Sequence, residues 1–347
     1  MNDLGGSGTR NTAENGDPPL RKDDNQTKPV SAAPDIDYYG VPAIHAPHWK
    51  WLIITYFYLG GISGASYVIA TIADRLDDRS NRQIVQTARY LALASFLPCP
   101  VLLILDLGRP KRFLYMLRVL KLRSPMSLGT WGLSAFGLFV TLSAMVETSR
   151  QERVSRRLGP RGAEALNRHW ISNIGTGIAL FVAGYTGVLL AATAVPLWMK
   201  RPLFLGPVFL CSAFSTAAAA IEIIMTVPPD SDHATRHRLA RLEAVALLAE
   251  MTMLGIWLVR LGSTAEPLTL GLRGQIFRQG VVGFGMVAPM MLRAMTHRNH
   301  HTLGRITGAL AALCSLAGGF ALRYAVITGG HTSAQNPRAT FDLARRN

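Results

Sequence analysis

The sequence predicts an all-α integral membrane protein with eight membrane-spanning helices. Three observations support this fold class: apolar residues make up 49% of the chain, they gather into eight long runs, and short charged connectors separate the runs. A hydrocarbon core roughly 30 Å thick needs about 20 largely apolar residues per helix. A soluble α/β protein with eight such runs would have no polar surface left, so that class is excluded.

The eight runs follow one another along most of the chain. They cover residues 51–73, 88–107, 128–147, 171–197, 203–227, 242–262, 276–295 and 306–328. Residues 1–44 differ in composition, being rich in Asn, Asp, Gly, Pro and Ser, and are expected to form a disordered polar tail. No apolar segment follows a basic start there, so a cleaved signal peptide is not predicted. The membrane domain is expected at 45–330, followed by a C-terminal tail at 331–347.

Several cofactors and partners are disfavoured by the residue pattern. Cys99, Cys211 and Cys314 lie singly in different runs, without the spacing of a zinc site or an iron–sulfur cluster. None of the nine histidines falls in the middle of a run, which argues against a dihaem cytochrome b. The formal net charge of +15 comes from basic connectors beside the spans, so nucleic acid is not an expected partner, whereas membrane lipid is.

The distribution of Lys and Arg predicts the orientation. The odd-numbered connectors hold most of the arginines, which places them in the cytoplasm and both chain termini outside. One connector on the outer side is nevertheless basic, with Arg109, Lys111, Arg112, Arg118, Lys121 and Arg123. A partner protein is the favoured explanation for that loop, and acidic lipid headgroups or a reversed orientation are the alternatives.

Ionisable residues inside the runs are the first functional candidates, because charges are costly in hydrocarbon. Glu243 and Glu250 are two helical turns apart and therefore share a face. With Glu222 they would form a series from the inner surface towards the midplane. This series is either a proton path or a set of carboxylates paired with arginines for packing. Glu147, which is followed by a basic connector, is interpreted as the end of a helix.

A second group of candidates lies at the predicted outer end. It contains His45, His48, Asp106, Arg109 and Arg323 beside the aromatic residues Trp49 and Trp198. A quinone headgroup requires a hydrogen-bond donor and acceptor, a carboxylate that exchanges protons, and apolar walls. These residues provide such groups, although an interfacial aromatic belt with boundary histidines is the alternative interpretation.

Several motifs together resemble the NrfD family of membrane subunits, which includes the polysulfide reductase anchor. They are Leu-Asp-Leu-Gly-Arg-Pro at 105–110, Ser-Pro-Met-Ser at 124–127, Gly-Tyr-Thr-Gly at 184–187 and Leu-Arg-Tyr at 322–324, together with the glycine-rich residues 58–64. The resemblance extends over residues 45–330. It implies two four-helix bundles without haem or an iron–sulfur cluster in this chain.

The resemblance also implies a function and a site. Such a subunit exchanges electrons between membrane quinone, such as menaquinone, and a docked ferredoxin-like iron–sulfur subunit, with a further catalytic subunit, for example molybdenum-containing, in the complex. It would be non-catalytic alone and would lie in the bacterial inner membrane. By position His48 matches the family's quinone-binding His, His45 stands where the family has Asn, and Tyr185 matches its Tyr. Asp106 and Arg109 match its loop motif.

Two other functions remain open at the level of sequence. A transporter or proton channel would use the buried carboxylates, and interruptions at Pro98, Pro100 and Pro289 agree with it, but no repeat accompanies them. A passive membrane tether would tolerate changes at the outer ends of the helices without loss of electron flow.

Overall fold

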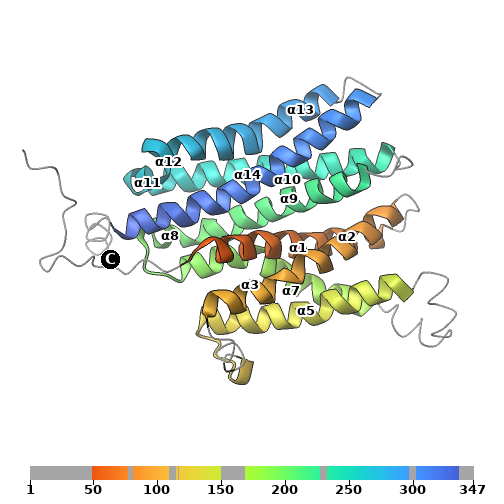
Figure 1. Ribbon diagram of the computed structural model, residues 1–347, viewed down its shortest axis with the longest axis horizontal. Coiled ribbons are helices and arrows are strands. Elements are labelled where there is room, and N and C mark those ends of the chain that lie inside the picture. The colour runs from red at the N-terminus through yellow and green to blue at the C-terminus, as the bar shows by residue number, and fades with distance from the viewer. Residues whose placement is uncertain are drawn as a thin grey trace, which may run out of the picture. The chain divides into compact units, whose positions relative to one another are not determined.

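The computed structural model describes residues 49–76, 81–108, 115, 117–149, 169–226, 233–296 and 302–335. Within these ranges all regular structure is helical (Figure 1). This confirms the predicted class of helical integral membrane protein, since seven candidate spans are found. The polar tail 1–44 lies outside the described residues.

Five helices come from the first half of the chain. They are α1 (Trp51–Arg75), α2 (Arg82–Phe96), α3 (Pro98–Leu107), α5 (Pro125–Ser149) and α7 (His169–Ala191). The second predicted run is therefore divided between α2 and α3, and the helix starts earlier than expected. Pro98 and Pro100 lack the backbone N–H that a continuous helix would use, which explains the interruption.

The second half of the chain contains the remaining elements. They are α8 (Pro196–Met199), η2 (Pro202–Phe204), α9 (Leu205–Thr226), α10 (His233–Leu261), η3 (Gly262–Ala265), α11 (Glu266–Thr269), α12 (Gly271–Gln275), η4 (Ile276–Val287), α13 (Ala288–Thr296) and α14 (Thr302–Ala334). Helix α14 continues four residues beyond 330, where the sequence analysis ended the membrane domain.

Fewer than eight helices of the described residues are long and apolar enough to count as membrane spans. Seven segments qualify in the described residues, and the predicted run 276–295 is not among them. This run is divided between the π-helical η4, with 12 residues, and α13, with nine, so neither alone reaches the length of a span. Both elements nevertheless pack along α14.

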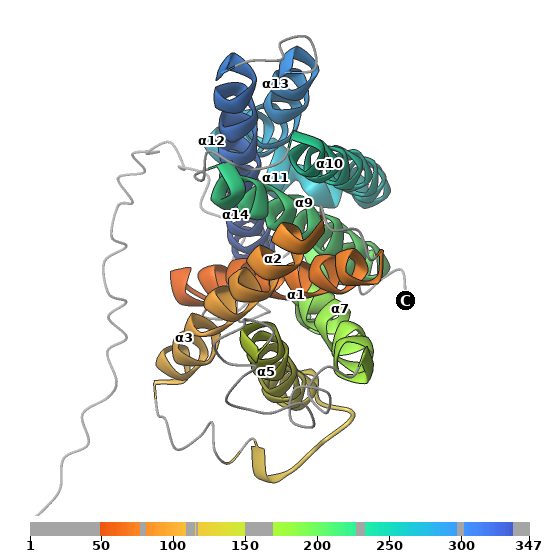
Figure 2. The same ribbon diagram turned by 90° about the vertical axis from the view of Figure 1, so that its right-hand side faces the viewer.

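Helices α1 and α9 lie side by side and connect two groups of helices (Figure 2). Helix α1 packs on α2, α3 and α7, and α5 packs on α2 and α7. Helix α9 packs on α10 and α14, while η4 and α13 cover another side of α14. The described residues all belong to one compact unit, residues 36–347.

Small residues allow the backbones to approach closely at three crossings. A Cβ at Gly64 of α1 would lie 2.6 Å from the carbonyl oxygen of Ala179 in α7. A Cβ on Gly187 would overlap the backbone of Gly206, and Gly285 and Gly318 exclude a Cβ from each other in the same way. Such contacts are expected where helices associate in lipid without a hydrophobic driving force.

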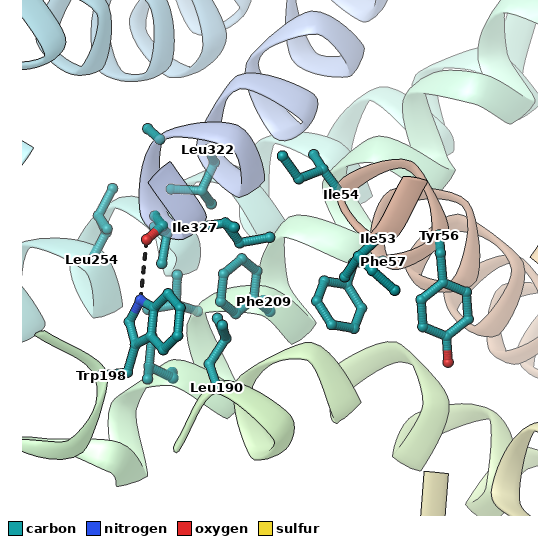
Figure 3. Close-up of a cluster of buried hydrophobic side chains, with 14 of the residues drawn as sticks. Ile53, Ile54, Tyr56, Phe57, Leu190, Trp198, Phe209, Leu254, Leu322 and Ile327 are labelled. Atoms are coloured by element: carbon teal, nitrogen blue, oxygen red, sulfur yellow. Dashed lines mark hydrogen bonds between the residues drawn. The ribbon is translucent and has the colours of Figure 1, made fainter. Parts of the chain in front are cut away.

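The main apolar core lies where the two groups meet (Figure 3). Ile53, Ile54 and Phe57 of α1 face Phe209 of α9, with Leu322 and Ile327 of α14 nearby. Trp198 is fully buried, and its indole N–H donates to the carbonyl of Val326 at 3.1 Å. This bond fixes the short helix α8 against α14.

Candidate functional site

The structure places two predicted site residues, Asp106 and Tyr185, towards the end of the helices at which α1 begins, here called the Trp51 end. Helix α1 begins there, α3 ends there, α5 begins there, and α7 reaches it (Figure 1). Asp106 is in the last turn of α3 and is partly exposed, and Lys50 is close enough to attract it electrostatically. His45, His48 and Arg109 lie outside the described residues.

Tyr185 is buried in α7, facing the start of α5. Its hydroxyl donates a hydrogen bond to the carbonyl of Pro125. Gly129 leaves room for the ring, because a Cβ there would overlap the Tyr185 side chain. The predicted quinone-site tyrosine therefore has a defined orientation between α5 and α7, and its single hydroxyl proton is engaged by the protein.

A second tyrosine, which the sequence analysis did not select, lies close to Tyr185. Tyr56 of α1 lies near Tyr185 and near Cys99 of α3, and its side chain is buried, with 7% of the residue exposed. Phe181 packs on Tyr185 with ring centroids 5.2 Å apart. Two tyrosines among apolar side chains provide the phenol groups and walls that a quinone headgroup needs. The sequence signal for Tyr56 was only a phenol inside an apolar run.

Trp49 marks the beginning of the described residues at the Trp51 end. Its ring stacks on Trp198 with centroids 5.5 Å apart and contacts Phe57 edge-on at 6.2 Å. The sequence analysis allowed Trp49 and Trp198 to be members of an interfacial belt. The structure joins them in one stacked pair that connects the start of α1 to α8.

Glu222 and Glu243 meet at the opposite side of the molecule, towards the end of α1, here called the Arg75 end. Arg293 of α13 pairs with Glu222 at 2.6 Å and also with Glu243. Ser315 of α14 donates a hydrogen bond to Glu243. The sequence analysis left arginine pairing open as the alternative to a proton path, and both carboxylates are indeed paired.

Glu250 lies two turns further along α10, about 10 Å from Glu243 along the helix axis. It is 2% exposed and accepts a hydrogen bond of 2.9 Å from Ser215 of α9. Arg323 of α14 is near enough to interact with it electrostatically. Glu250 therefore belongs to a different polar group from Arg293, and apolar side chains such as Leu247 lie between the two carboxylates along α10.

A third buried ionic group lies at the Arg75 end between α1, α2 and α5. Glu147 is 1% exposed and pairs with Arg82 at 2.5 Å and with Arg89 at 3.9 Å, while Arg89 also pairs with Asp74 at 2.8 Å. The sequence analysis interpreted Glu147 as the end of a helix. Glu147 is also a buried carboxylate shared by two arginines.

Metal-binding residues do not cluster in the described part of the chain. No group of three or more His, Cys, Asp or Glu side chains is placed there to hold an ion. The three cysteines are free and lie on α3, α9 and α14. The candidate chemistry of the described residues is therefore that of phenols, carboxylates and arginines.

Comparison with known proteins gives consistent matches over most of the sequence. The family model described as polysulphide reductase, NrfD, matches residues 43–334. The C subunit of polysulfide reductase from Wolinella succinogenes is 28% identical over 302 residues, covering 82% of this protein and 94% of that subunit. Protein NrfD of Escherichia coli is 25% identical over 305 residues, covering 81% and 94%.

Proposed function

Since this chain belongs to the polysulphide reductase NrfD family, we propose that it is the quinone-binding membrane subunit of a respiratory oxidoreductase complex. A relative named as one subunit of polysulfide reductase supports a role within a larger enzyme. In this proposal a quinol releases two electrons and two protons, or a quinone takes them up, near the Trp51 end. The electrons pass to or from a ferredoxin-like iron–sulfur partner, and a further catalytic subunit acts on the terminal substrate.

The observation that carries the proposal is the position of Tyr185. It lies towards the Trp51 end, beside Tyr56 of α1. Helix α1 also packs against α3, and α3 carries Asp106 in its last turn. The Tyr185 hydroxyl is held by Pro125, so it can accept a hydrogen bond from a quinol hydroxyl without moving. To donate to a quinone carbonyl, it would have to release Pro125. His48, His45 and Arg109 complete the proposed site from residues outside the described ranges.

The proposed membrane arrangement is eight helices in two four-helix bundles. Residues 271–296 are helical throughout and pack along α14, which supports counting them as a further span. The first bundle would contain α1, the α2–α3 pair, α5 and α7, and the second α9, α10, residues 271–296 and α14. With eight spans both termini lie on one side, which the arginine distribution places outside the bacterial inner membrane.

Proton transfer is a second part of the proposal. Glu222, Glu243 and Glu250 are buried along α9 and α10, and each has a hydrogen-bonded or ionic partner. Ionisable groups are costly inside membrane spans, and where they occur they often belong to proton relays. The same residues would also suit a transporter or proton channel. If the carboxylates transfer protons but the protein binds no quinone, a transporter or proton channel would be favoured instead.

Binding of a quinol analogue to the purified subunit tests the proposal. We expect quenching of tryptophan fluorescence on binding, with weaker affinity in His48→Ala and Tyr185→Phe. Tyr115→Phe is the matched control, because Tyr115 is exposed and lies on a connector. Unchanged binding in both site variants would refute the assigned site. Absence of binding in the folded protein and in the assembled complex would refute the function and favour a tether or transporter.

A further inference from the structure

Arg323 is a fully buried guanidinium within the span formed by α14. One terminal nitrogen donates to the Ser212 hydroxyl at 3.1 Å and to the Gly319 carbonyl at 2.8 Å. Its Nε and its other terminal nitrogen have no hydrogen-bond partner in the described part of the chain, and no described carboxylate forms an ion pair with it. A buried charge with so few partners requires compensation from nearby groups.

Ser212 accepts a hydrogen bond from Arg323 and lies near Glu250. The serine oxygen accepts from the arginine, which leaves the serine proton free to donate to the Glu250 carboxylate. Ser215, one turn further along α9, donates to the same carboxylate at 2.9 Å. Arg323 and Glu250 are therefore bonded to two serines one turn apart on α9, at the place where α14, α9 and α10 meet.

Helix α1 closes the other side of the arginine. The Tyr58 ring lies 5.5 Å from the guanidinium carbon, and its hydroxyl donates to the Leu316 carbonyl at 3.0 Å. A Cβ at Gly61 would lie 2.7 Å from a guanidinium nitrogen, so this glycine makes room for the charge. Tyr56, two residues before Tyr58, faces Cys99 and Tyr185 instead. Helix α1 therefore contacts the proposed quinone site on one side and Arg323 on the other.

We propose that Arg323 is a positioning residue that favours the carboxylate form of Glu250 through Ser212, and that this contact controls when Glu250 accepts a proton. The inference rests on the proposed function, because it assigns a control point to the proposed proton path. Glu250 would gain a proton when the Arg323–Ser212 contact lengthens.

The other polar groups near Glu250 do not replace Arg323. Helix α9 contributes Ser212, Ser215 and the thiol of Cys211, none of which carries a positive charge. On α10 itself, Glu243 is two turns away and has its own cation, Arg293. Arg323 is therefore the cation assigned to Glu250 within the described residues.

Chemical modification of Glu250 tests the proposal without measuring quinone turnover. Dicyclohexylcarbodiimide enters lipid and reacts with buried carboxyl groups only when they are protonated. We would incubate the full-length purified protein with it and measure the modified Glu250 peptide by mass spectrometry, using Glu250→Gln as the blank. At about pH 9, we expect modification in Arg323→Gln to be about tenfold faster than in wild type, because a nearby opposite charge favours the ionised form by about that factor.

Three further variants separate the charge from general loosening of the fold. Arg323→Lys keeps the positive charge and should largely restore the slow rate of Glu250 modification. Ser212→Ala keeps both charges but removes the serine hydroxyl between them, so it should raise the rate. Ser333→Ala, a buried serine on the same helix, should leave it unchanged. If Arg323→Gln does not fold, Ser212→Ala carries the test. The Glu243 peptide serves as the internal control, because its partner is Arg293.

Equal rates in wild type, Arg323→Gln and Ser212→Ala would overturn the inference, as would an equal rise at Glu243. Quinol-analogue binding is measured in parallel on His48→Ala and Tyr185→Phe. Faster Glu250 modification in Arg323→Gln together with unaltered binding in both of these variants would support the Arg323 assignment and refute the assigned quinone site. The reverse pattern would refute the Arg323 assignment alone.

Discussion

Arg293 and Glu222 form a two-point ion pair between residues 71 positions apart. The two terminal guanidinium nitrogens of Arg293 donate to the two carboxylate oxygens of Glu222 at 3.4 and 2.6 Å. The same guanidinium also pairs with Glu243. One arginine on α13 thus holds carboxylates on α9 and α10, and it fixes a segment that, by length and hydropathy, does not qualify as a span.

Replacing Arg293 should therefore strongly destabilise the fold. In Arg293→Gln two buried carboxylates lose their shared cation, which we expect to cost about 3–5 kcal/mol of unfolding free energy. Reversible denaturation of the purified protein in detergent measures this change. The control is Arg278→Gln, because Arg278 is exposed and its side chain bonds the Gly274 carbonyl of its own helix, so a change within about 0.5 kcal/mol is expected. Equal losses in both variants would contradict the structural role of Arg293.

The two arginines beside Glu147 should differ in importance. Arg89 is 2% exposed and has Asp74 as a second partner, whereas Arg82 is 44% exposed. Arg89→Ala should cost about 3–5 kcal/mol, because it removes a buried cation that pairs with both Asp74 and Glu147. Arg82→Ala should cost less than Arg89→Ala, because Arg82 is the exposed partner and Arg89 remains beside Glu147. The comparison is made by thermal unfolding at matched detergent concentration, and the reverse ranking would contradict the burial seen here.

Two glycines of α1, one turn apart, should respond oppositely to alanine. A Cβ at Gly64 would lie 2.6 Å from the Ala179 carbonyl oxygen, so Gly64→Ala must separate α1 from α7 and should cost about 1–3 kcal/mol. Gly60 has open space at its Cβ position, and Gly60→Ala should be neutral or stabilise the helix by up to about 1 kcal/mol. Unfolding free energies of the two variants check this, and similar values would argue against the close crossing.

The orientation of Tyr185 should matter as much as its hydroxyl. Gly129→Ala would push the ring from its place beside Pro125, so we expect weaker binding of the quinol analogue, by about fivefold or more, the equivalent of one lost hydrogen bond. Gly177→Ala is the control, because a Cβ there meets nothing within 4 Å. Fluorescence titration measures both affinities. Wild-type affinity in Gly129→Ala would show that the placement of Tyr185 is irrelevant to binding.

Reporter fusions decide whether residues 271–296 cross the membrane. An alkaline phosphatase that is active only outside the cytoplasm is fused after residue 269, after residue 300 and after Asn347. Eight spans with both termini outside predict activity at residue 269, none at residue 300 and activity again at Asn347. Activity at residue 300 but not at Asn347 would indicate seven spans, with η4 and α13 not crossing.

The sequence by itself determined the membrane class, most of the spans and the family. These properties are local: a run of about 20 apolar residues matches a bilayer whatever packs beside it, and the motifs around Asp106, Gly184 and Arg323 are contiguous in the chain. The shared face of Glu243 and Glu250 also follows from helical periodicity alone. Sequence reasoning named Glu222, Glu243 and Glu250 as costly residues but did not assign their partners.

Only the tertiary structure decided those partners. Arg293 meets Glu222 across 71 residues, and Arg323 reaches Ser212 across 111, because α13 and α14 pack against α9 and α10. The burial of Glu147 and the meeting of Tyr56 with Tyr185 depend on helix packing in the same way. The sequence shows that a charged residue in a span has an unfavourable free energy in hydrocarbon. The partner that compensates for this free energy depends on which faces of the helices pack together, and only the tertiary structure shows that.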